Sequence, residues 1–280
     1  MLNTLVDILT PLRFTPPALL LAGWASAVQG HEFWIDPVAH QVPEGAPIIA
    51  DTRVGEAFEG ASYSYRPNAF RRFEIVQGGT VAPVEGRLGD MPAVDQAAPA
   101  DGLAVVVHVT SDNELVYRDF AKFAKFVRHK DAEWVLARHR ARGLPDADFT
   151  ELYSRYAKAL VAVGTGAGKD QELGLLTEIT ALANPYTDDL PDGLPVRVSY
   201  AGAPRAGAQV EVFEKTSSGD VEVFSVTTDA EGRAIVPVAP GHRYMLDAVV
   251  LRKPETPVAA ATGAVWESLW ANLTFELPGR

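Results

Sequence analysis

Residues 103–110 read LAVVVHVT, and this run decides what kind of fold the chain adopts. Its centre, Ala104-Val105-Val106-Val107, is β-branched and apolar, which is typical of a strand buried on both faces. Apolar or alternating runs also lie upstream, from Ile48 to Val54 and from Arg71 to Val76, between clusters of Gly, Pro and Asp. Several short strands with turns between them predict a β-sandwich rather than a βαβ unit.

The middle of the chain has a helical pattern instead. Apolar residues recur at helical spacing from Phe120 to Arg142, and the helix breaker Gly143-Leu144-Pro145 follows. A second stripe begins near Asp148 and consists of Phe149, Leu152, Tyr153, Tyr156 and Leu160. The two stripes predict a helical hairpin, over about residues 120–163, that packs on the preceding sheet.

The polar face of the first predicted helix is basic, since it carries Lys122, Lys125, Arg128 and His129. Such a face could dock an acidic partner or the anionic headgroups of a membrane. It could equally be an ordinary solvated face. The sequence leaves both interpretations open.

A second β-rich domain is expected over residues 190–280. It follows a cluster of breakers, and its apolar residues alternate cleanly at Val196, Val198 and Tyr200 and again at Val210 and Val212. The stretch TTDAEGRAIVPV, residues 227–238, resembles the turn and strand of small prealbumin-like or carboxypeptidase-regulatory-like sandwiches. The resemblance implies a structural or adhesive module without catalysis.

Residues 1–30 have the layout of a secretory signal peptide. Arg13 provides a weak positive flank, and the apolar run from Ala18 to Val28 ends in small residues and is too short to span a bilayer. Cleavage is expected after Ala27 or after Gly30. The mature protein is then expected in the periplasm, with no transmembrane span.

The stretch HEFWIDP, His31 to Pro37, follows the signal directly. It is expected to form the first strand of the predicted domain over residues 31–189, with Phe33 and Ile35 on one face and Trp34 on the other. If cleavage follows Gly30, His31 becomes the mature N-terminus. Its amine and imidazole could then chelate one metal ion through two nitrogens.

Composition excludes several classes of protein. The chain has 280 residues, 47% of them hydrophobic and 22% charged, which suits two globular domains after the signal. A net charge of -11 argues against nucleic acid as a partner. The chain has no cysteine, so disulfides, zinc fingers and thiol nucleophiles are excluded.

The histidines offer one candidate metal site. His40, His108, His129, His139 and His242 are scattered, without His-x-His or HExxH spacing. His108 is the residue we expect to join His31, with Glu32, Asp36 or Glu56 as oxygen ligands; alternatively, His108 is a core histidine. No nucleophile elbow, dinucleotide fingerprint or carboxylate pair is present, so the chain is not expected to be an enzyme.

Several motifs together resemble a family of bacterial periplasmic proteins of unknown function, labelled NikM-like or as periplasmic components of cobalt and nickel transport. These motifs are HEFWIDP, GEAFEG, RRFEIV, LYSRYAKALV, NPY and the terminal WESLWANLTFELP. The resemblance implies export, two β-domains and the handling of a divalent metal. Members of that family often carry histidine at the position of Glu56 and near Val250, where this sequence has none.

Two functions follow from these observations. The first is an exported accessory or binding protein that handles one divalent ion, nickel, cobalt or copper, for an inner- or outer-membrane uptake transporter. The second is a non-catalytic interaction module, without metal, that associates with an outer-membrane transporter. The fold expected for both is mainly β: a sandwich with a helical hairpin, then a smaller prealbumin-like or Ig-like sandwich.

Overall fold

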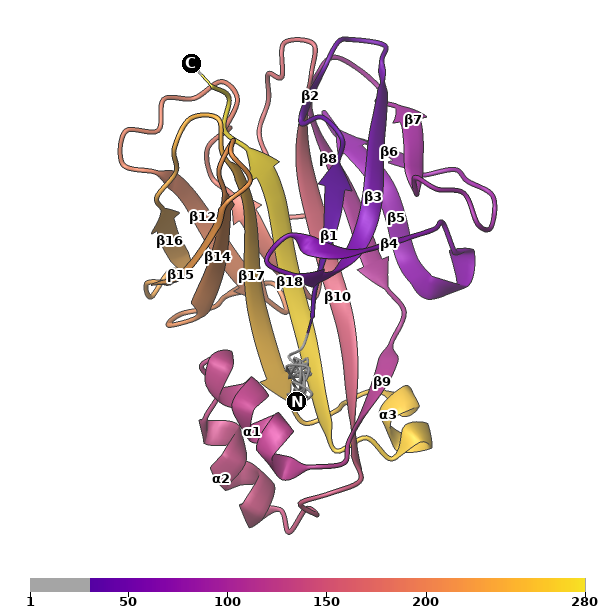
Figure 1. Ribbon diagram of the computed structural model, residues 1–280, viewed down its shortest axis with the longest axis vertical. Coiled ribbons are helices and arrows are strands. Elements are labelled where there is room, and N and C mark those ends of the chain that lie inside the picture. The colour runs from indigo at the N-terminus through magenta and orange to yellow at the C-terminus, as the bar shows by residue number, and fades with distance from the viewer. Residues whose placement is uncertain (1–30, 280) are drawn as a thin grey trace, which may run out of the picture.

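The computed structural model describes residues 31–279, and it confirms a mainly β chain with a short helical insert (Figure 1). The signal peptide expected over residues 1–30 lies outside the described residues. The first strand, β1 (Glu32–Pro37), begins within HEFWIDP as expected. Figure 1 shows the helices gathered at one end of the strands.

The largest sheet has ten strands. Eight follow one another in the order β15-β14-β17-β18-β10-β8-β5-β6, while β2 and β9 also pair with β10. Their bounds are β2 (Gln41–Val42), β5 (Phe70–Gln77), β6 (Thr80–Pro83), β8 (Gly102–Thr110), β9 (Asn113–Tyr117), β10 (Phe149–Val163), β14 (Gln209–Lys215), β15 (Val221–Thr227), β17 (Arg243–Arg252) and β18 (Trp266–Glu276).

Two four-stranded sheets and the helices complete the architecture. One sheet contains β1, β3 (Pro47–Glu56), β4 (Glu59–Tyr63) and β7 (Val94–Ala97). The other contains β11 (Thr177–Ala181), β12 (Leu194–Tyr200), β13 (Ala203–Pro204) and β16 (Arg233–Val236). The helices are α1 (Phe120–His129), α2 (Trp134–Ala141) and α3 (Pro257–Thr262), with a 3-10 turn η1 (Pro67–Ala69).

Strand β8 is buried along its whole length, as the valine run predicts. Val105 and Val107 point into a core shared with Ile179 of β11 and Val196 of β12. The intervening residues of β8 point into a second core with Ile35 of β1. The large sheet therefore has a small sheet packed against each face, and β8 is buried between them.

The helix expected over residues 149–163 is wrong, because this segment is strand β10. Along β10, alternate residues enter the two opposite cores, so both faces are apolar and the period of two is hidden. The apolar stripe from Phe149 to Leu160 follows helical spacing only by coincidence. The helical hairpin is therefore confined to α1 and α2, which divide the single helix expected from Phe120 to Arg142.

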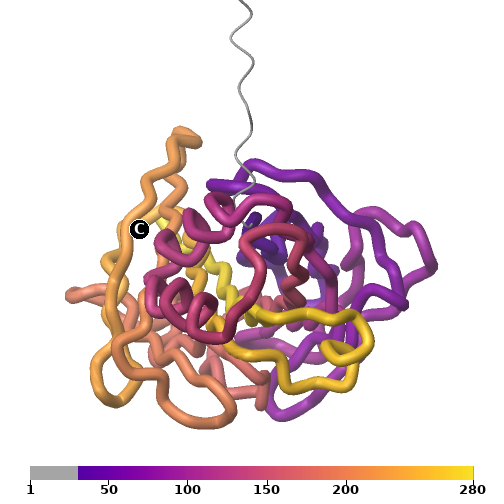
Figure 2. The backbone as a smooth tube through the Cα atoms, turned by 90° about the horizontal axis from the view of Figure 1, so that it is seen from below, coloured from indigo at the N-terminus to yellow at the C-terminus, as the bar shows by residue number. Residues whose placement is uncertain are grey.

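Local chemistry sets the ends of α1. The Asp119 carboxylate accepts a hydrogen bond from the Ala121 amide at 2.8 Å, which caps the first turn. At the other end Asp131 adopts a left-handed φ of 52°, so the chain leaves the helix after Lys130. Figure 2 shows the two magenta helices lying across the end of the molecule, between the purple and the orange segments.

The predicted ranges 31–189 and 190–280 share one sheet. Strand β10 from the first range pairs in parallel with β18 from the second, from Glu151 opposite Trp266 to Ala159 opposite Thr274. Strand β18 also pairs with β17 along its whole length. The two ranges are thus joined by a continuous hydrogen-bonded ladder through the centre of the molecule.

Strands β3 and β4 form a tight hairpin. Strands β3 and β4 are joined at Ala57 and Phe58, which have left-handed φ values of 49° and 62°. Gly55 faces Gly60 across the hairpin so closely that neither position has room for a Cβ. Glu32, the first residue of β1, pairs with Gly55 of β3. Glu56, the last residue of β3, therefore lies at the same end of this sheet as His31.

Candidate functional site

A buried lysine at the end of α1 is surrounded by three carboxylates. The Lys130 ammonium nitrogen lies 2.6 Å from Oε2 of Glu211, 3.0 Å from Oδ2 of Asp247 and 3.3 Å from Oε1 of Glu32. All four side chains are almost fully buried. Because buried charges must be paired, these four residues act as one electrostatic unit, which we call the Lys130 cluster.

The helix positions Lys130 for this role. Residues on the inner face of α1, including Phe123, Phe126 and Val127, pack against the sheet, so the last turn points toward the strands. The ammonium also lies 4.9 Å from the centre of the Trp270 ring on β18. A cation is favoured at this end of a helix, where the backbone carbonyls carry partial negative charge.

The three carboxylates come from strands far apart in the sequence. Glu32 is on β1, Glu211 on β14 and Asp247 on β17. Glu211 and Asp247 stand directly opposite each other in the antiparallel pair β14–β17, where like charges repel. The Lys130 ammonium offsets that repulsion.

Burial and the attraction between opposite charges within the cluster act in opposite directions on the pKa values of its members. Burial raises the pKa of Glu32 to about 7, although the Lys130 charge acts in the opposite direction. Burial likewise raises the pKa of Asp247. For Lys130, burial acts to lower the pKa, but the attraction of the three carboxylates outweighs it and the pKa is raised. The lysine is therefore held as a permanent internal cation.

A pocket of about 230 Å³ lies beside the cluster. Its polar lining consists of His31, Glu32, Glu56, His129 and Glu211. The His129 Nε2 atom lies 2.9 Å from Oε1 of Glu211, and this hydrogen bond raises the pKa of His129. Two imidazoles and three carboxylates thus meet in one concave site.

Two details bear on whether this pocket suits a cation. The guanidinium of Arg155 donates a hydrogen bond to the His31 backbone carbonyl at 2.9 Å, which anchors the chain at the rim. Oε2 of Glu32 and Oδ1 of Asp247 are buried and accept no hydrogen bond from any described residue. Unpaired buried carboxylate oxygens are costly, and of these two residues Glu32 lines the pocket whereas Asp247 does not.

One carboxylate oxygen from each of Glu32, Glu211 and Asp247 lies within 4.8 Å of the other two. The Lys130 ammonium lies between these carboxylates, in the position that a metal ion would otherwise take. The neighbouring groups that could hold a divalent ion are His31, His129 and Glu56, which line the adjoining pocket. Imidazole and carboxylate ligands suit divalent transition metals.

The structure separates His108 from His31. His108 lines a different pocket, on the other side of β1, and its ring lies 4.9 Å from Phe33 and 4.7 Å from Phe73. Its pKa is lowered to about 3 by burial, and Nδ1 has no hydrogen-bond partner among the described residues. The expected pairing with His31 is replaced by a neutral core histidine, which was the alternative reading of the sequence.

The other predicted site residues do not form one site. Lys122, Lys125 and Arg128 are exposed on α1, and Arg128 pairs with Glu133 at 3.2 Å. His129, expected to belong to that basic face, instead reaches the pocket. Asp36, a possible oxygen ligand, forms an ion pair with Arg53 at 2.8 Å and does not line the pocket.

Sequence reasoning missed Lys130, Glu211 and Asp247. A signal for two of them was present, since Glu211 and Asp247 each interrupt an apolar strand, in VEVF and MLDAVV. A charged residue between buried neighbours on a strand implies a buried partner. No local pattern indicates that the partner is Lys130.

Comparison with known proteins places the chain in a family but assigns no activity. The profile described as "Domain of unknown function (DUF4198)" matches residues 28–252. No curated protein matches the chain. No described helix is both long enough and apolar enough to cross a membrane.

The chain is distantly similar to several solved structures. One is "Crystal structure of tetra-tandem repeat in extending region of large adhesion protein", at 10% identity and a TM-score of 0.21, covering 88% of this chain. This chain spans half of that structure, 50% of its length. Another is "D0-D1 domain of Intimin", at 13% identity and a TM-score of 0.19, covering 88% of this chain and 97% of that one.

Proposed function

The chain belongs to the family of domains of unknown function DUF4198, and we propose that this member is an exported periplasmic accessory or binding protein for a divalent transition metal. Nickel, cobalt and copper are the candidate ions, and a membrane transporter for metal uptake is the candidate partner. No chemical transformation is proposed.

The pocket beside the Lys130 cluster is the observation that carries this proposal. Its lining brings the imidazoles of His31 and His129 together with the carboxylates of Glu32, Glu56 and Glu211. Nitrogen and oxygen ligands of this kind bind divalent ions in the Irving–Williams order, so copper should bind most tightly in vitro. If cleavage follows Gly30, the His31 amine adds one more nitrogen.

Calorimetric titration with Ni²⁺, Co²⁺ and Cu²⁺ tests the proposal, on protein whose N-terminus has been identified by mass spectrometry. We expect one ion per chain, with affinity reduced at least tenfold in His31→Ala and in His129→Ala. His242→Ala is the matched control, because His242 pairs with Glu214 and does not line the pocket. Absence of binding by the wild type, or equal binding by all the variants, would contradict the metal site.

Export needs its own test. Residues 1–40 fused to a reporter that is active only outside the cytoplasm should give signal. A silent fusion, with full-length protein in the cytosol, would rule out the periplasmic assignment.

One observation favours the second candidate, an interaction module without metal. The Lys130 ammonium already supplies positive charge to the three carboxylates, so the cluster is a stable internal ion network without any added ion. If no ion binds, this reading remains, with an outer-membrane transporter as the candidate partner.

A further inference from the structure

A second concave site shares no lining residue with the pocket beside the Lys130 cluster, and its charged residues are cationic. A groove of about 520 Å³ runs between α2, the end of β17 and the start of β18. Its lining includes two tryptophans and four cationic residues: Trp134, Trp266, Arg138, Arg142, Arg252 and Lys253. A cavity of this volume is within the range of ligand-binding sites.

Two of the four cations are fixed by the fold. Arg252 forms an ion pair with Glu267 at 2.8 Å, and Glu255 lies 3.5 Å away. Arg142 donates a hydrogen bond to the Val265 carbonyl at 2.7 Å, and its guanidinium lies 4.8 Å from the centre of the Trp266 ring. The fold therefore orients these two guanidinium groups before any ligand arrives.

The other two cations, Arg138 and Lys253, are exposed and form no ion pair with any described residue. Arg142 also has no carboxylate within ion-pairing distance among the described residues. Three uncompensated cations thus line one groove on a chain whose net charge is -11. Such a local excess of positive charge is complementary to a ligand with carboxylates.

Trp134 supplies an apolar contact in the same groove. It is 55% exposed, and no other tryptophan or phenylalanine in residues 31–279 is classed as exposed. Its ring meets the buried Trp266 edge to face, with 6.2 Å between the ring centres. Tryptophan and arginine are among the residues enriched in the hot spots of protein interfaces.

We propose that this groove binds an acidic peptide segment of a partner protein, with an aromatic or aliphatic side chain against Trp134 and flanking carboxylates on Arg138, Arg142 and Lys253. A concave site admits an extended peptide, whereas a flat bilayer would not reach its floor. The overall charge of -11 opposes long polyanions such as nucleic acid, but a short peptide bears little of that repulsion.

A random decapeptide array, probed with the full chain, tests the proposal without assuming a sequence. We expect the bound peptides to be enriched in Asp and Glu next to an aromatic or aliphatic residue. Lack of acidic enrichment would overturn the proposal. Equal binding to vesicles of anionic phospholipid would also overturn it, in favour of a membrane surface.

Variants then locate the site. The best peptide should quench tryptophan fluorescence, and its affinity should fall about tenfold or more in Trp134→Ala and in the double variant Arg138→Gln/Lys253→Gln. The matched control is Lys122→Gln/Lys125→Gln, which removes two exposed cations from α1, outside the groove. If the control weakens binding as much as the groove variants do, the peptide follows general charge and the proposed site is wrong.

Discussion

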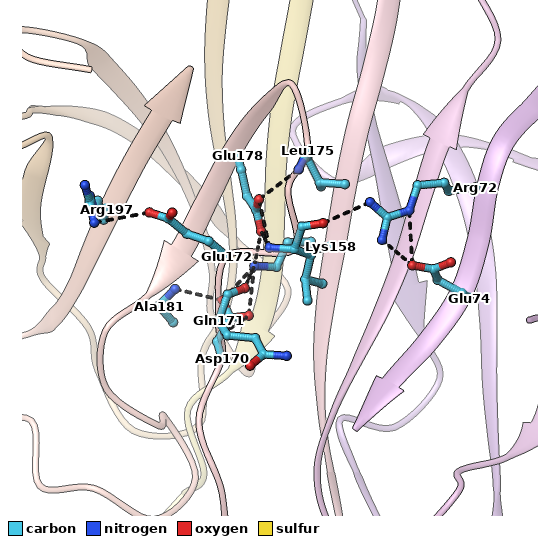
Figure 3. A network of polar contacts seen from close by, with 11 residues as sticks. Arg72, Glu74, Lys158, Asp170, Gln171, Glu172, Leu175, Glu178, Ala181 and Arg197 are labelled. Carbon is cyan, nitrogen blue, oxygen red and sulfur yellow. Dashed lines mark hydrogen bonds and ion pairs between the residues drawn. The ribbon is translucent and has the colours of Figure 1, made fainter. Parts of the chain in front are cut away.

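The ammonium of Lys158 lies 2.8 Å from Oδ1 of Asp170, and neither side chain is exposed to solvent. The same ammonium lies 3.0 Å from Oε1 of Glu178 on β11 (Figure 3). Glu178 in turn accepts hydrogen bonds from the backbone amides of Leu173 and Leu175. Lys158 therefore ties the central strand β10 to the loop before β11 and to β11 itself.

Replacing Lys158 should be strongly destabilising. Lys158→Met leaves two buried carboxylates without their counter-ion, which costs about 3–5 kcal/mol. Urea denaturation would measure the free energy of unfolding, with Lys169→Met as the control because Lys169 is exposed. The triple variant Lys158→Met/Asp170→Asn/Glu178→Gln should recover part of the loss, since no unpaired charge remains. A loss below about 1 kcal/mol in the single variant would contradict this role.

Lys130→Met should convert the Lys130 cluster into a site that requires a cation. Without the ammonium, Glu32, Glu211 and Asp247 repel one another within 4.8 Å. We expect a lower Tm in the presence of a chelator and recovery on adding Ni²⁺, because an ion that binds only the folded state stabilises it. Lys122→Met, on the exposed face of α1, should keep the wild-type Tm in chelator and the wild-type response to Ni²⁺. An unrescued Lys130→Met protein would argue against a dication at this cluster.

His108 should make the protein less stable in acid. Its folded pKa is depressed from 6.5 to about 3, so its contribution to stability is present above pH 6.5 and is lost as the pH falls. Below pH 6.5 the unfolded chain binds a proton that the folded chain does not, at a cost of about 1.4 kcal/mol per pH unit.

Between pH 7.5 and pH 5, the free energy of unfolding of His108→Leu should therefore fall by about 2 kcal/mol less than that of the wild type. Urea denaturation at both values measures the difference. Parallel pH profiles for wild type and His108→Leu would show that His108 is not held neutral in the folded protein.

The segment 190–280 should not fold alone, although its strands and turns are locally complete. Strand β18 lies between β17 and β10, and removal of residues 31–189 exposes its β10 edge and the apolar faces that pack on it. We expect the isolated segment to show no cooperative thermal unfolding, in contrast to residues 31–280. A sharp transition with native-like circular dichroism would show that the range is an independent domain after all.

Local chemistry determined much of the β-structure. The Val-rich run of β8 and the alternation in HEFWIDP both specify strands, because each pattern is a property of a few adjacent residues. A few adjacent residues also specify the turn at Asp229. Its carboxylate accepts hydrogen bonds from the amides of Glu231 and Arg233, and Gly232 takes the left-handed φ of 73° that the turn requires.

Strand β10 and the candidate site could not be predicted from local sequence, because both depend on tertiary contacts. Periodicity reports burial on one face, so a strand covered on both faces, such as β10, loses the signal that separates it from a helix. The contacts of Lys130 with Glu211 and Asp247 span 81 and 117 residues. Such contacts depend on strand register and on the direction in which α1 ends, and neither is encoded in any local stretch of the sequence.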